Sequence, residues 1–219
     1  MIWEVIVVVI FREGTPMCII LYGVYLVFEG LSFRAASRAL EAFARRSHVS
    51  IWRWVQWLPP LERLFLARRV RCFLVDETMV KVGGVEGWVW VAYEPYQRRF
   101  LGLRFSWIRN SMTAEAFLRQ MVKRYGRHPV YTDGASWYPE ACSSLGLEHR
   151  LLNDEYRSLI ERAIETVKDR TEAFDDHYPC RRKGCSLNHV KNWLKSFNLH
   201  QQPEYQKLIG QIKEAISLK

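Results

Sequence analysis

Residues 71–78 read Arg-Cys-Phe-Leu-Val-Asp-Glu-Thr, an apolar run that leads directly into the acidic residue Asp76. Polar and apolar residues alternate little across 71–76, which is typical of a strand buried on both faces. A second short run, Val-Tyr-Thr-Asp-Gly at residues 130–134, leads into Asp133 in the same way. We therefore predict two buried strands, each ending at an aspartate.

Two more strands are predicted soon after the first one. Gly83 and Gly84 indicate a tight turn, and residues 87–93 and 99–107 have the composition of strands. Short turns between successive strands favour antiparallel neighbours. Residues 71–107 are thus expected to form three antiparallel strands.

Helices and strands alternate in the rest of the core. The predicted elements are a helix at 113–125 with Thr113 as its cap, a strand at 129–132, a helix near 138–144, a strand at 148–152 and a helix at 155–174. The first of these helices could be the crossover that lets the fourth strand pair in parallel with the first. This order resembles the plan of the ribonuclease H-like fold, an α/β class with a mixed sheet flanked by helices. In that plan the two aspartates are neighbours.

A third carboxylate is predicted on the last of these helices. Glu161 and Glu165 lie one turn apart on the same helical face. We favour Glu161 because Lys168 follows it by seven residues, which is two turns along that face and about 10 Å up the helix axis. A cation at this position could hold a DNA phosphate beside the acidic cluster. Glu165 remains the alternative third acid.

Three carboxylates in one place repel one another unless a cation neutralises them. Oxygen ligands select Mg²⁺ or Mn²⁺ over softer metals, and two such ions roughly 3.5 to 4 Å apart can bind the attacking and the leaving oxygen of a displacement at phosphorus. The candidate metal ligands and catalytic residues are Asp76, Asp133 and Glu161. The alternative for each aspartate taken singly is a turn former or a helix cap.

The basic residues are unevenly distributed along the chain. The 219 residues carry a formal charge of +9, and residues 31–71 alone contain nine Arg, no Lys and only two acids. A local concentration of Arg favours contacts with phosphate, because the guanidinium offers a planar fork of donors. The alternative is a solvated surface on which the charges cluster by chance.

Two short amphipathic helices are predicted in this basic stretch. One spans residues 33–40 with Ser32 as its cap, and the other spans 50–58, where apolar residues recur at helical spacing. Because their connection is brief, residues 31–58 are a candidate helix-turn-helix. The positions expected to face a DNA groove are Arg46, His48, Ser50, Arg53 and Gln56. The alternative is an ordinary helical pair, and Trp54 is expected to be core in either case.

Pro59 and Pro60 are expected to end this module, since proline cannot continue a helix. The predicted organisation is a helical N-terminal region at 1–60, a connector at 61–70, and a catalytic domain with C-terminal helices at 71–219. The role of residues 1–30 stays open.

Cysteine usage and hydropathy indicate a reducing cytoplasm and no membrane role. Five Cys, an odd number spread along the chain, do not match the disulfide framework of a secreted domain. The apolar run at 17–28 is shorter than the ~20 residues that a membrane span needs. A possible zinc site with unusual spacing consists of His177, Cys180, Cys185 and His189, although the basic residues between them suit a DNA-facing loop as readily.

Taken together, these features resemble those of the DDE transposases of bacterial and archaeal insertion sequences, in particular the small ones with a helix-turn-helix before the catalytic core. The resemblance covers about residues 31–198. The segments that carry it are Ser-His-Val-Ser-Ile-Trp-Arg-Trp-Val-Gln at 47–56, Val-Asp-Glu-Thr at 75–78, Tyr-Thr-Asp-Gly at 131–134, Glu-His-Arg at 148–150, Leu-Ile-Glu at 159–161 and Lys-Asp-Arg-Thr at 168–171.

The resemblance implies that Asp76, Asp133 and Glu161 form a catalytic triad accompanied by the cation of Lys168. It further implies Mg²⁺ or Mn²⁺ as cofactor, binding to the terminal inverted repeats of the element, and cleavage followed by joining of the 3′ ends to target DNA. The expected assembly is a homodimer or a higher synaptic complex acting in the nucleoid.

One interval departs from the family pattern. Glu161 follows Asp133 by 28 positions, fewer than is usual in such enzymes. Two alternative functions stay open: a catalytically decayed relative that only binds DNA, and a ribonuclease H-like nuclease that cuts without joining.

Overall fold

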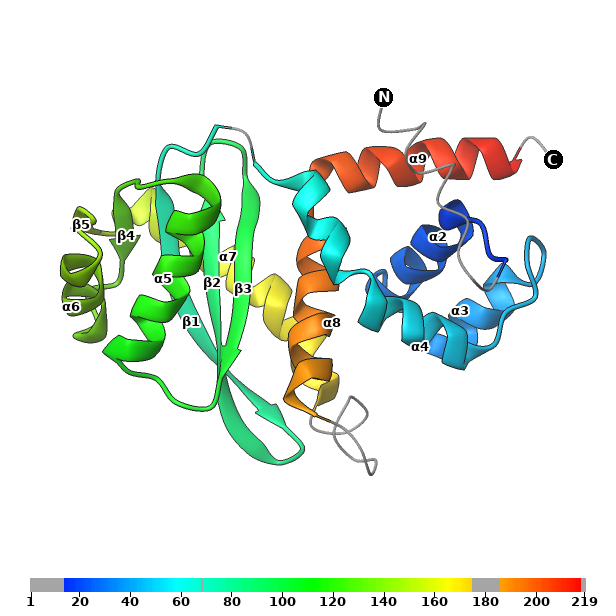
Figure 1. The fold of residues 1–219 in the computed structure, drawn as a ribbon, viewed down its shortest axis with the longest axis horizontal. Helices are drawn as coiled ribbons and strands as arrows, with labels where there is room; N and C mark the ends of the chain where they lie inside the picture. The colour runs from blue at the N-terminus through cyan, green and yellow to red at the C-terminus, as the bar shows by residue number, and fades with distance from the viewer. Residues whose placement is uncertain (1–13, 68, 175–185, 218–219) are drawn as a thin grey trace. The chain divides into compact units, whose positions relative to one another are not determined.

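The structure is a computed structural model that describes residues 14–67, 69–174 and 186–217 (Figure 1). By its internal contacts the chain divides into two compact units. The first contains the described residues up to Phe65 together with those from Leu199 onward, and the second runs from Leu66 to Asn198. The sequence-based division assigned everything after residue 70 to the catalytic domain, whereas the structure groups the last helix with the N-terminal helices.

The first unit is helical. Its elements are α2 (Met17–Phe28), α3 (Phe33–Leu40), α4 (His48–Trp57), the 3₁₀ helix η1 (Pro59–Phe65) and α9 (Pro203–Ser217). Helix α2 is apolar on most sides and contacts α3, α4 and α9. A Cβ atom at Gly23 would lie 3.0 Å from side-chain atoms of both Leu40 and Trp54, so the missing side chain lets the three helices approach closely. Trp54 is buried, as predicted.

Two side chains of helix α9 donate hydrogen bonds to helix α2. The Tyr205 hydroxyl donates to the Leu21 carbonyl at 2.8 Å, and the Lys213 ammonium donates to the Tyr25 hydroxyl at 2.8 Å. Tyr205 is fully buried. Residues more than 180 positions apart in the chain therefore belong to one small helical unit, and α2 has a structural role as its central helix.

In the predicted helix-turn-helix segment, the first helix begins where the sequence predicts it and the second begins earlier. Ser32 caps α3 as predicted, because its hydroxyl accepts the Ala35 amide at 3.2 Å. Helix α4 begins at His48 rather than Ser50, since the Ser47 hydroxyl accepts the Ser50 amide and acts as the cap. The second helix therefore starts two residues earlier than predicted.

The second unit is an α/β structure with a mixed five-stranded sheet. Its elements are β1 (Phe73–Val82), β2 (Val85–Glu94), β3 (Arg99–Ser106), α5 (Ser111–Tyr125), β4 (Val130–Thr132), α6 (Trp137–Ser144), β5 (His149–Leu151), α7 (Asp154–Thr171), the 3₁₀ helix η2 (Glu172–Phe174) and α8 (Leu187–His200). The strand order is β3-β2-β1-β4-β5. Strands β1, β2 and β3 are antiparallel neighbours, whereas β4 pairs in parallel with both β1 and β5. This is the predicted ribonuclease H-like plan.

Helices cover both faces of this sheet (Figure 1). Side chains of α5 and α6 form one core with Phe73 and Val75 of β1 and Trp90 of β2. Helix α7 packs against β1 and β2 from the other face. In the part of the chain that the structure describes, no helix is both long and apolar enough to cross a bilayer.

Two local predictions about this unit were wrong. Asp76 does not end its strand, because β1 continues to Val82 as a hairpin partner of β2 and Asp76 pairs with Val91. Helix α5 begins at Ser111, not Thr113. The cap is Asn110, whose side chain accepts the Thr113 amide at 3.0 Å while the Thr113 hydroxyl accepts the Asn110 amide, a reciprocal capping box.

Candidate metal-dependent active site

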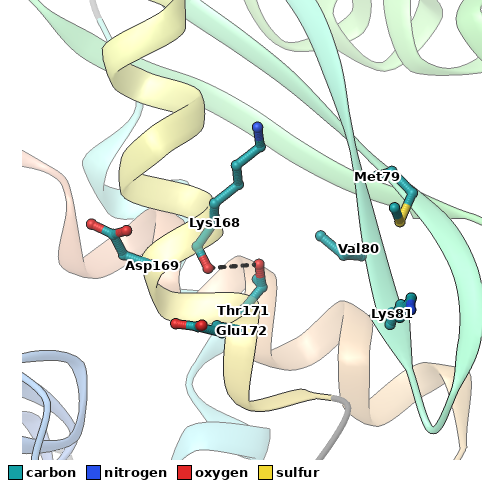
Figure 2. Close-up of a pocket in the computed structure, with 7 residues that line it drawn as sticks. All are labelled: Met79, Val80, Lys81, Lys168, Asp169, Thr171 and Glu172. Atoms are coloured by element: carbon teal, nitrogen blue, oxygen red, sulfur yellow. Dashed lines mark hydrogen bonds between the residues drawn. The ribbon is translucent and has the colours of Figure 1, made fainter.

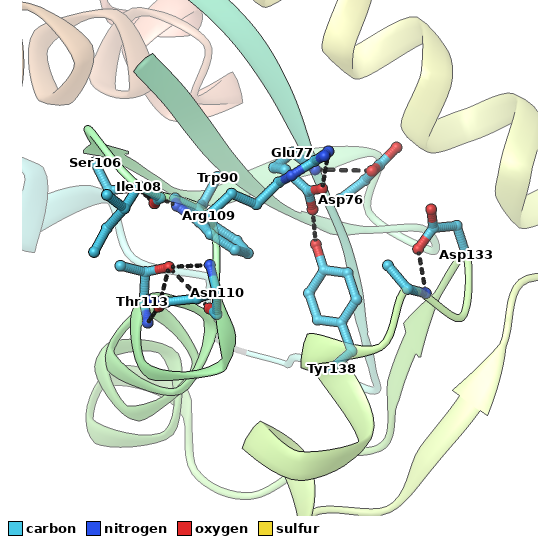
Figure 3. Close-up of polar contacts among 11 residues, drawn as sticks. Asp76, Glu77, Trp90, Ser106, Ile108, Arg109, Asn110, Thr113, Asp133 and Tyr138 are labelled. Carbon is cyan, nitrogen blue, oxygen red and sulfur yellow. Dashed lines mark hydrogen bonds and ion pairs between the residues drawn. The ribbon is translucent and has the colours of Figure 1, made fainter. Parts of the chain in front are cut away.

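The two predicted aspartates leave adjacent strands at the same level of the sheet. The parallel pairing of β1 with β4 includes Leu74 opposite Tyr131, and each aspartate follows two residues later. Residues two apart in a strand share a face, so Asp76 lies with Leu74 on the face that α7 covers. Figure 3 shows Asp133, in the turn after β4, close to Asp76 within β1.

Helix α7 contributes the remaining polar groups. A cavity of about 420 Å³ is lined by Asp76 on β1 and by Glu161, Glu165 and Lys168 on α7. These three α7 residues share one helical face, as their spacing predicted. Both glutamates and the lysine are exposed, so their side chains can reach a ligand in the cavity.

Lys168 also lines a second cavity of about 440 Å³ that continues between the end of α7 and β1. Figure 2 shows the lysine extending from α7 toward the strand, with Met79, Val80 and Lys81 on the opposite wall. The carbonyl of Lys168 accepts the Thr171 hydroxyl at 3.3 Å, which secures the last turn of the helix. Lys168 thus stands where the two cavities adjoin.

The turn that carries Asp133 is held by its own hydrogen bonds. The Asp133 carboxylate accepts the Ala135 amide at 3.0 Å, and the Thr132 hydroxyl accepts the Gly134 amide at 3.2 Å. Gly134 has a φ of +90°, a conformation that L side chains rarely adopt, and a Cβ there would lie 2.8 Å from Leu151. Asp133 therefore sits in a backbone conformation that requires glycine next to it.

His149 of β5 lies behind this turn. Its Nε2 atom is 2.7 Å from the Thr132 hydroxyl. Burial lowers the pKa of His149, while the charge of Asp133 opposes this shift. The histidine thus borders the site through Thr132 rather than through the aspartate itself.

Burial is the main reason why the Asp76 carboxyl binds its proton unusually tightly. Burial, together with the charges of Glu77, Asp133 and Glu161, raises the pKa of Asp76 to about 7, against the hydrogen bond from the Glu77 amide at 2.8 Å. A carboxylate that is both desolvated and surrounded by like charge is costly to keep ionised. The site therefore has an unbalanced negative charge.

Glu77, the residue after Asp76, also lines the first cavity, and its side chain is bonded to residues of two other segments (Figure 3). Its side chain is only 4% exposed. The Tyr138 hydroxyl of α6 donates to Oε2 of Glu77, and the Arg109 guanidinium donates to Oε1 at 3.3 Å. Arg109 in turn lies over the Trp88 ring at 3.8 Å and over the Trp137 ring at 4.5 Å.

Comparison with known proteins decides the family of this chain. A family profile described as a DDE domain, that of the IS240 type of transposase, matches residues 70–202, which is more than half of the sequence. The chain belongs to the DDE transposases. The match spans the sheet, the two aspartates and α7, so the resemblance seen in the sequence is confirmed.

This DDE transposase is similar to a protein of Methanocaldococcus jannaschii and, more distantly, to solved integrase structures. Uncharacterized protein MJ0017 of Methanocaldococcus jannaschii is 30% identical over 173 residues, covering 78% of this chain and 79% of that protein. The catalytic core domain of BIV integrase covers 69% of this chain and 100% of its own, with 16% identity and a TM-score of 0.45. The HTLV-2 integrase catalytic core domain, solved in complex with magnesium, covers 58% and 83%, with 15% identity and a TM-score of 0.43.

The carboxylate oxygens of Asp76, Asp133 and Glu161 have the chemistry that a hard divalent cation requires. Among the described residues, no three His, Cys, Asp or Glu side chains are arranged closely enough to hold an ion as they stand. The charges of Asp133 and Glu161 nevertheless raise the pKa of Asp76, and Glu161 is exposed and can change rotamer without losing a buried contact. Two neighbouring aspartates and a glutamate that can change rotamer supply the oxygen ligands that Mg²⁺ and Mn²⁺ prefer.

The predicted DNA-reading residues of α4 differ in their surroundings. His48 and Arg53 are exposed, and Ser50 is half-buried beside the cap of the helix. Arg46 precedes the helix, and its guanidinium donates to the Thr15 hydroxyl at 2.8 Å within the same unit. The Oε1 atom of Gln56 is buried. Arg46 and Gln56 therefore contribute to the packing of the unit.

Sequence reasoning missed the network around Glu77. The position of Glu77 beside Asp76 was visible, but Tyr138, Arg109 and the two Trp residues come from separate elements and carry no shared motif.

Of the four residues in the predicted zinc site, His177, Cys180 and Cys185 lie outside the described residues. The fourth candidate, His189, lies in the first turn of α8 and its Nδ1 atom accepts the Ser186 amide at 3.1 Å.

The raised pKa of Asp76 predicts that removing its charge stabilises the metal-free protein. The ordinary pKa of 3.8 applies in the unfolded chain, against about 7 in the folded one. The folded state binds this proton more tightly, so the associated stability is complete below about pH 4 and is lost as the pH rises through about 7. We expect Asp76→Asn to melt about 3–6 °C higher than the wild type at pH 8, or ~1–2 kcal/mol, and much less so at pH 4.5.

The measurement is thermal denaturation in EDTA at both pH values. Glu86→Gln, which neutralises an exposed carboxylate on β2, is the matched control and should change stability by less than ~0.5 kcal/mol at either pH. An Asp76→Asn protein no more stable than the wild type at pH 8 would show that the aspartate is not under the electrostatic strain described here.

Proposed function

We propose that this chain is an active transposase that binds the terminal inverted repeats of an insertion sequence, cleaves at the element ends and joins the 3′ ends to target DNA. The observation that carries the proposal is the arrangement of Asp76, Asp133 and Glu161 on one face of a ribonuclease H-like sheet, in a chain of the DDE transposase family. Membership of this family supports a metal-dependent nucleotidyl transferase activity. The presence of all three acidic residues supports the proposal that this chain keeps that activity.

Asp76, Asp133 and Glu161 would hold two divalent ions, Mg²⁺ or Mn²⁺. When bound, such ions supply Lewis acidity that makes water or a 3′-hydroxyl a better nucleophile and stabilises the leaving oxygen. Lys168, at the junction of the two cavities, would bind a phosphate on the DNA strand beside the cut.

The helical unit would bind the terminal repeats. Helix α4 presents Arg53 and His48 to solvent, with Ser50 beside them, and these three residues are proposed to contact DNA. Arg offers two parallel donors to a guanine edge, which is the commonest base-specific contact in the major groove. Because two element ends must be brought together before they are joined, the proposed working form is a homodimer or a higher synaptic complex, in the nucleoid.

Joining of DNA strands separates this proposal from a nuclease that only cuts. The experiment incubates purified full chain with labelled DNA carrying the element ends and an unlabelled target plasmid in Mg²⁺ or Mn²⁺. The proposal predicts that the label becomes covalently linked to the plasmid. Cleaved ends that never join would support the nuclease, and binding without cleavage would support a decayed relative.

Replacing Arg53 by Ala is expected to weaken binding to the terminal repeat by ~1–3 kcal/mol, or about 10-fold to 100-fold, and to lower the ratio of specific to random-DNA affinity. Arg38→Ala removes an exposed charge from α3 of the same unit and is the matched control. It should weaken binding to both DNAs alike. Fluorescence anisotropy with both DNAs measures the difference, and equal effects of the two variants would place sequence recognition elsewhere.

A further inference from the structure

The strand that carries Asp76 places a second carboxylate directly after it. Successive side chains of a strand point to opposite faces, so Glu77 is directed away from the face of Asp76 and toward α5 and α6. With 4% of its side chain exposed, Glu77 is a buried acid. Burying such a group without partners is strongly unfavourable, which makes its partners informative.

Each oxygen of Glu77 is bonded to a different part of the fold. Oε2 accepts the hydroxyl of Tyr138, in the first turn of α6, and Oε1 accepts Arg109 at 3.3 Å, from the segment before α5. Burial, and next the charge of Glu77, raise the pKa of Tyr138 well above its usual range, so the phenol stays protonated and donates. Tyr138 itself is fully buried.

Arg109 is held by two aromatic rings and by its own backbone, although 37% of its side chain is exposed. Its guanidinium lies between the rings of Trp88 and Trp137, at 3.8 and 4.5 Å. The backbone before it is secured by the Ser106 hydroxyl, which donates to the Ile108 carbonyl at 2.7 Å, and the backbone after it is secured by the Asn110 capping box. An arginine so confined has little rotamer entropy left to lose when it binds a carboxylate.

The network connects the two catalytic aspartates. On one side, the Glu77 amide donates to Oδ1 of Asp76 at 2.8 Å. On the other side, the Tyr138 amide donates to the Ala135 carbonyl at 3.0 Å, and the Ala135 amide donates to Oδ1 of Asp133 at 3.0 Å. The hydroxyl of Tyr138 thus closes a continuous path of hydrogen bonds and covalent links from one aspartate to the other. Figure 3 shows the part of this path that runs from Tyr138 through Glu77 to Asp76.

We propose that Glu77, anchored by Tyr138 and Arg109, is a positioning residue that fixes the separation of the Asp76 and Asp133 carboxylates and so prepares them to share a divalent ion. The inference rests on the proposed metal-dependent function. Two like-charged carboxylates tend to move apart when no cation lies between them. The Tyr138–Glu77 bond opposes this movement by tying the turn of Asp133 to β1.

The test removes one hydroxyl from the network in the full chain. Tyr138→Phe is expected to weaken Mn²⁺ binding by about 10-fold to 100-fold, the usual range when an outer partner of a metal ligand is lost. Tyr125→Phe is the matched control, because it removes a hydroxyl that donates to the Leu101 carbonyl at 2.9 Å, away from the acids. Electron paramagnetic resonance of free Mn²⁺ gives the dissociation constants without any DNA cleavage.

A second pair of variants separates position from charge. Glu77→Gln and Glu77→Ala both remove the negative charge, but only the amide oxygen of Gln can still accept the Tyr138 hydroxyl. We expect Glu77→Gln to bind Mn²⁺ at least ~10-fold more tightly than Glu77→Ala. In DNA cleavage, the weakened variants should need more Mn²⁺ for half-maximal rate and recover most of the rate at saturation.

The outcomes are distinguishable. A wild type that binds Mn²⁺ and cleaves DNA, together with Tyr138→Phe and Glu77→Ala proteins of unchanged Mn²⁺ affinity, would overturn the positioning role and leave the proposed function intact. Equal losses of affinity in Tyr138→Phe and Tyr125→Phe would also overturn it, since general loosening of the fold would then be the cause. A wild type that binds no Mn²⁺ would overturn both.

Discussion

Replacing Asp76 by Asn is expected to lower the rate of cleavage at the element ends by at least ~10³-fold, equivalent to about 4 kcal/mol of transition-state stabilisation. The substitution keeps the shape of the side chain and one oxygen that can accept the Glu77 amide, but it removes an anionic group from the acidic cluster. Asp133→Asn should have a similar effect, because both carboxylates are proposed to bind the same two metal ions from neighbouring strands. Single-turnover cleavage of a labelled repeat gives both rates.

Asp154→Asn serves as the control for this experiment. Asp154 is exposed in the first turn of α7 and lies two turns before Glu161, so its replacement should leave the cleavage rate unchanged. Binding of the terminal repeat should be retained in all three variants, since it is attributed to the helical unit. Cleavage by Asp76→Asn at the wild-type rate would remove Asp76 from the chemistry.

The second large effect is expected at the third acid. Both Glu161 and Glu165 line the cavity beside Asp76, but the charge of Glu161 is among those that raise the pKa of Asp76. We therefore expect Glu161→Gln to lower the cleavage rate by ~10²-fold to 10³-fold, or about 3–4 kcal/mol, and Glu165→Gln to lower it by less than ~10-fold.

The two glutamates form their own matched pair, since they are exposed residues one turn apart on the same helix. The same single-turnover assay, run at several Mg²⁺ concentrations, compares them. If Glu165→Gln were the more damaging variant, Glu165 would be the third acid, and the short interval after Asp133 would be lengthened by one helical turn. Equal losses would mean that the two side chains share the role.

Much of the catalytic unit follows from local sequence. Asp133 and Gly134 were predictable because a short apolar strand must end where a glycine with positive φ begins a turn. The face shared by Glu161 and Lys168 was predictable from the helical period alone. The sequence analysis placed Asp76 at a strand end, whereas β1 continues to Val82. This continuation depends on pairing with β2, and the residue types along one segment do not reveal such pairing.

Interactions between distant segments account for the remaining differences. The network around Glu77 forms from Tyr138, Arg109 and Trp88 only when α5, α6 and β2 pack together. No spacing of residues along the sequence therefore predicts it. Helix α9 joins the N-terminal helices through Tyr205, more than 180 residues from its partner Leu21. The hydrogen bond from Arg46 to the Thr15 hydroxyl likewise joins segments 31 residues apart, while the predicted DNA contact of Arg46 stays a prediction.

We propose that carboxylates from β1, from the turn after β4 and from α7 together make one metal-dependent site for DNA strand transfer. The decisive measurement is the amount of joined product that the wild-type chain forms from labelled element ends and target plasmid as a function of divalent ion. We expect no joined product in EDTA, and its appearance when Mg²⁺ or Mn²⁺ is added. Joined product formed equally well in EDTA would show that the site does not depend on a metal.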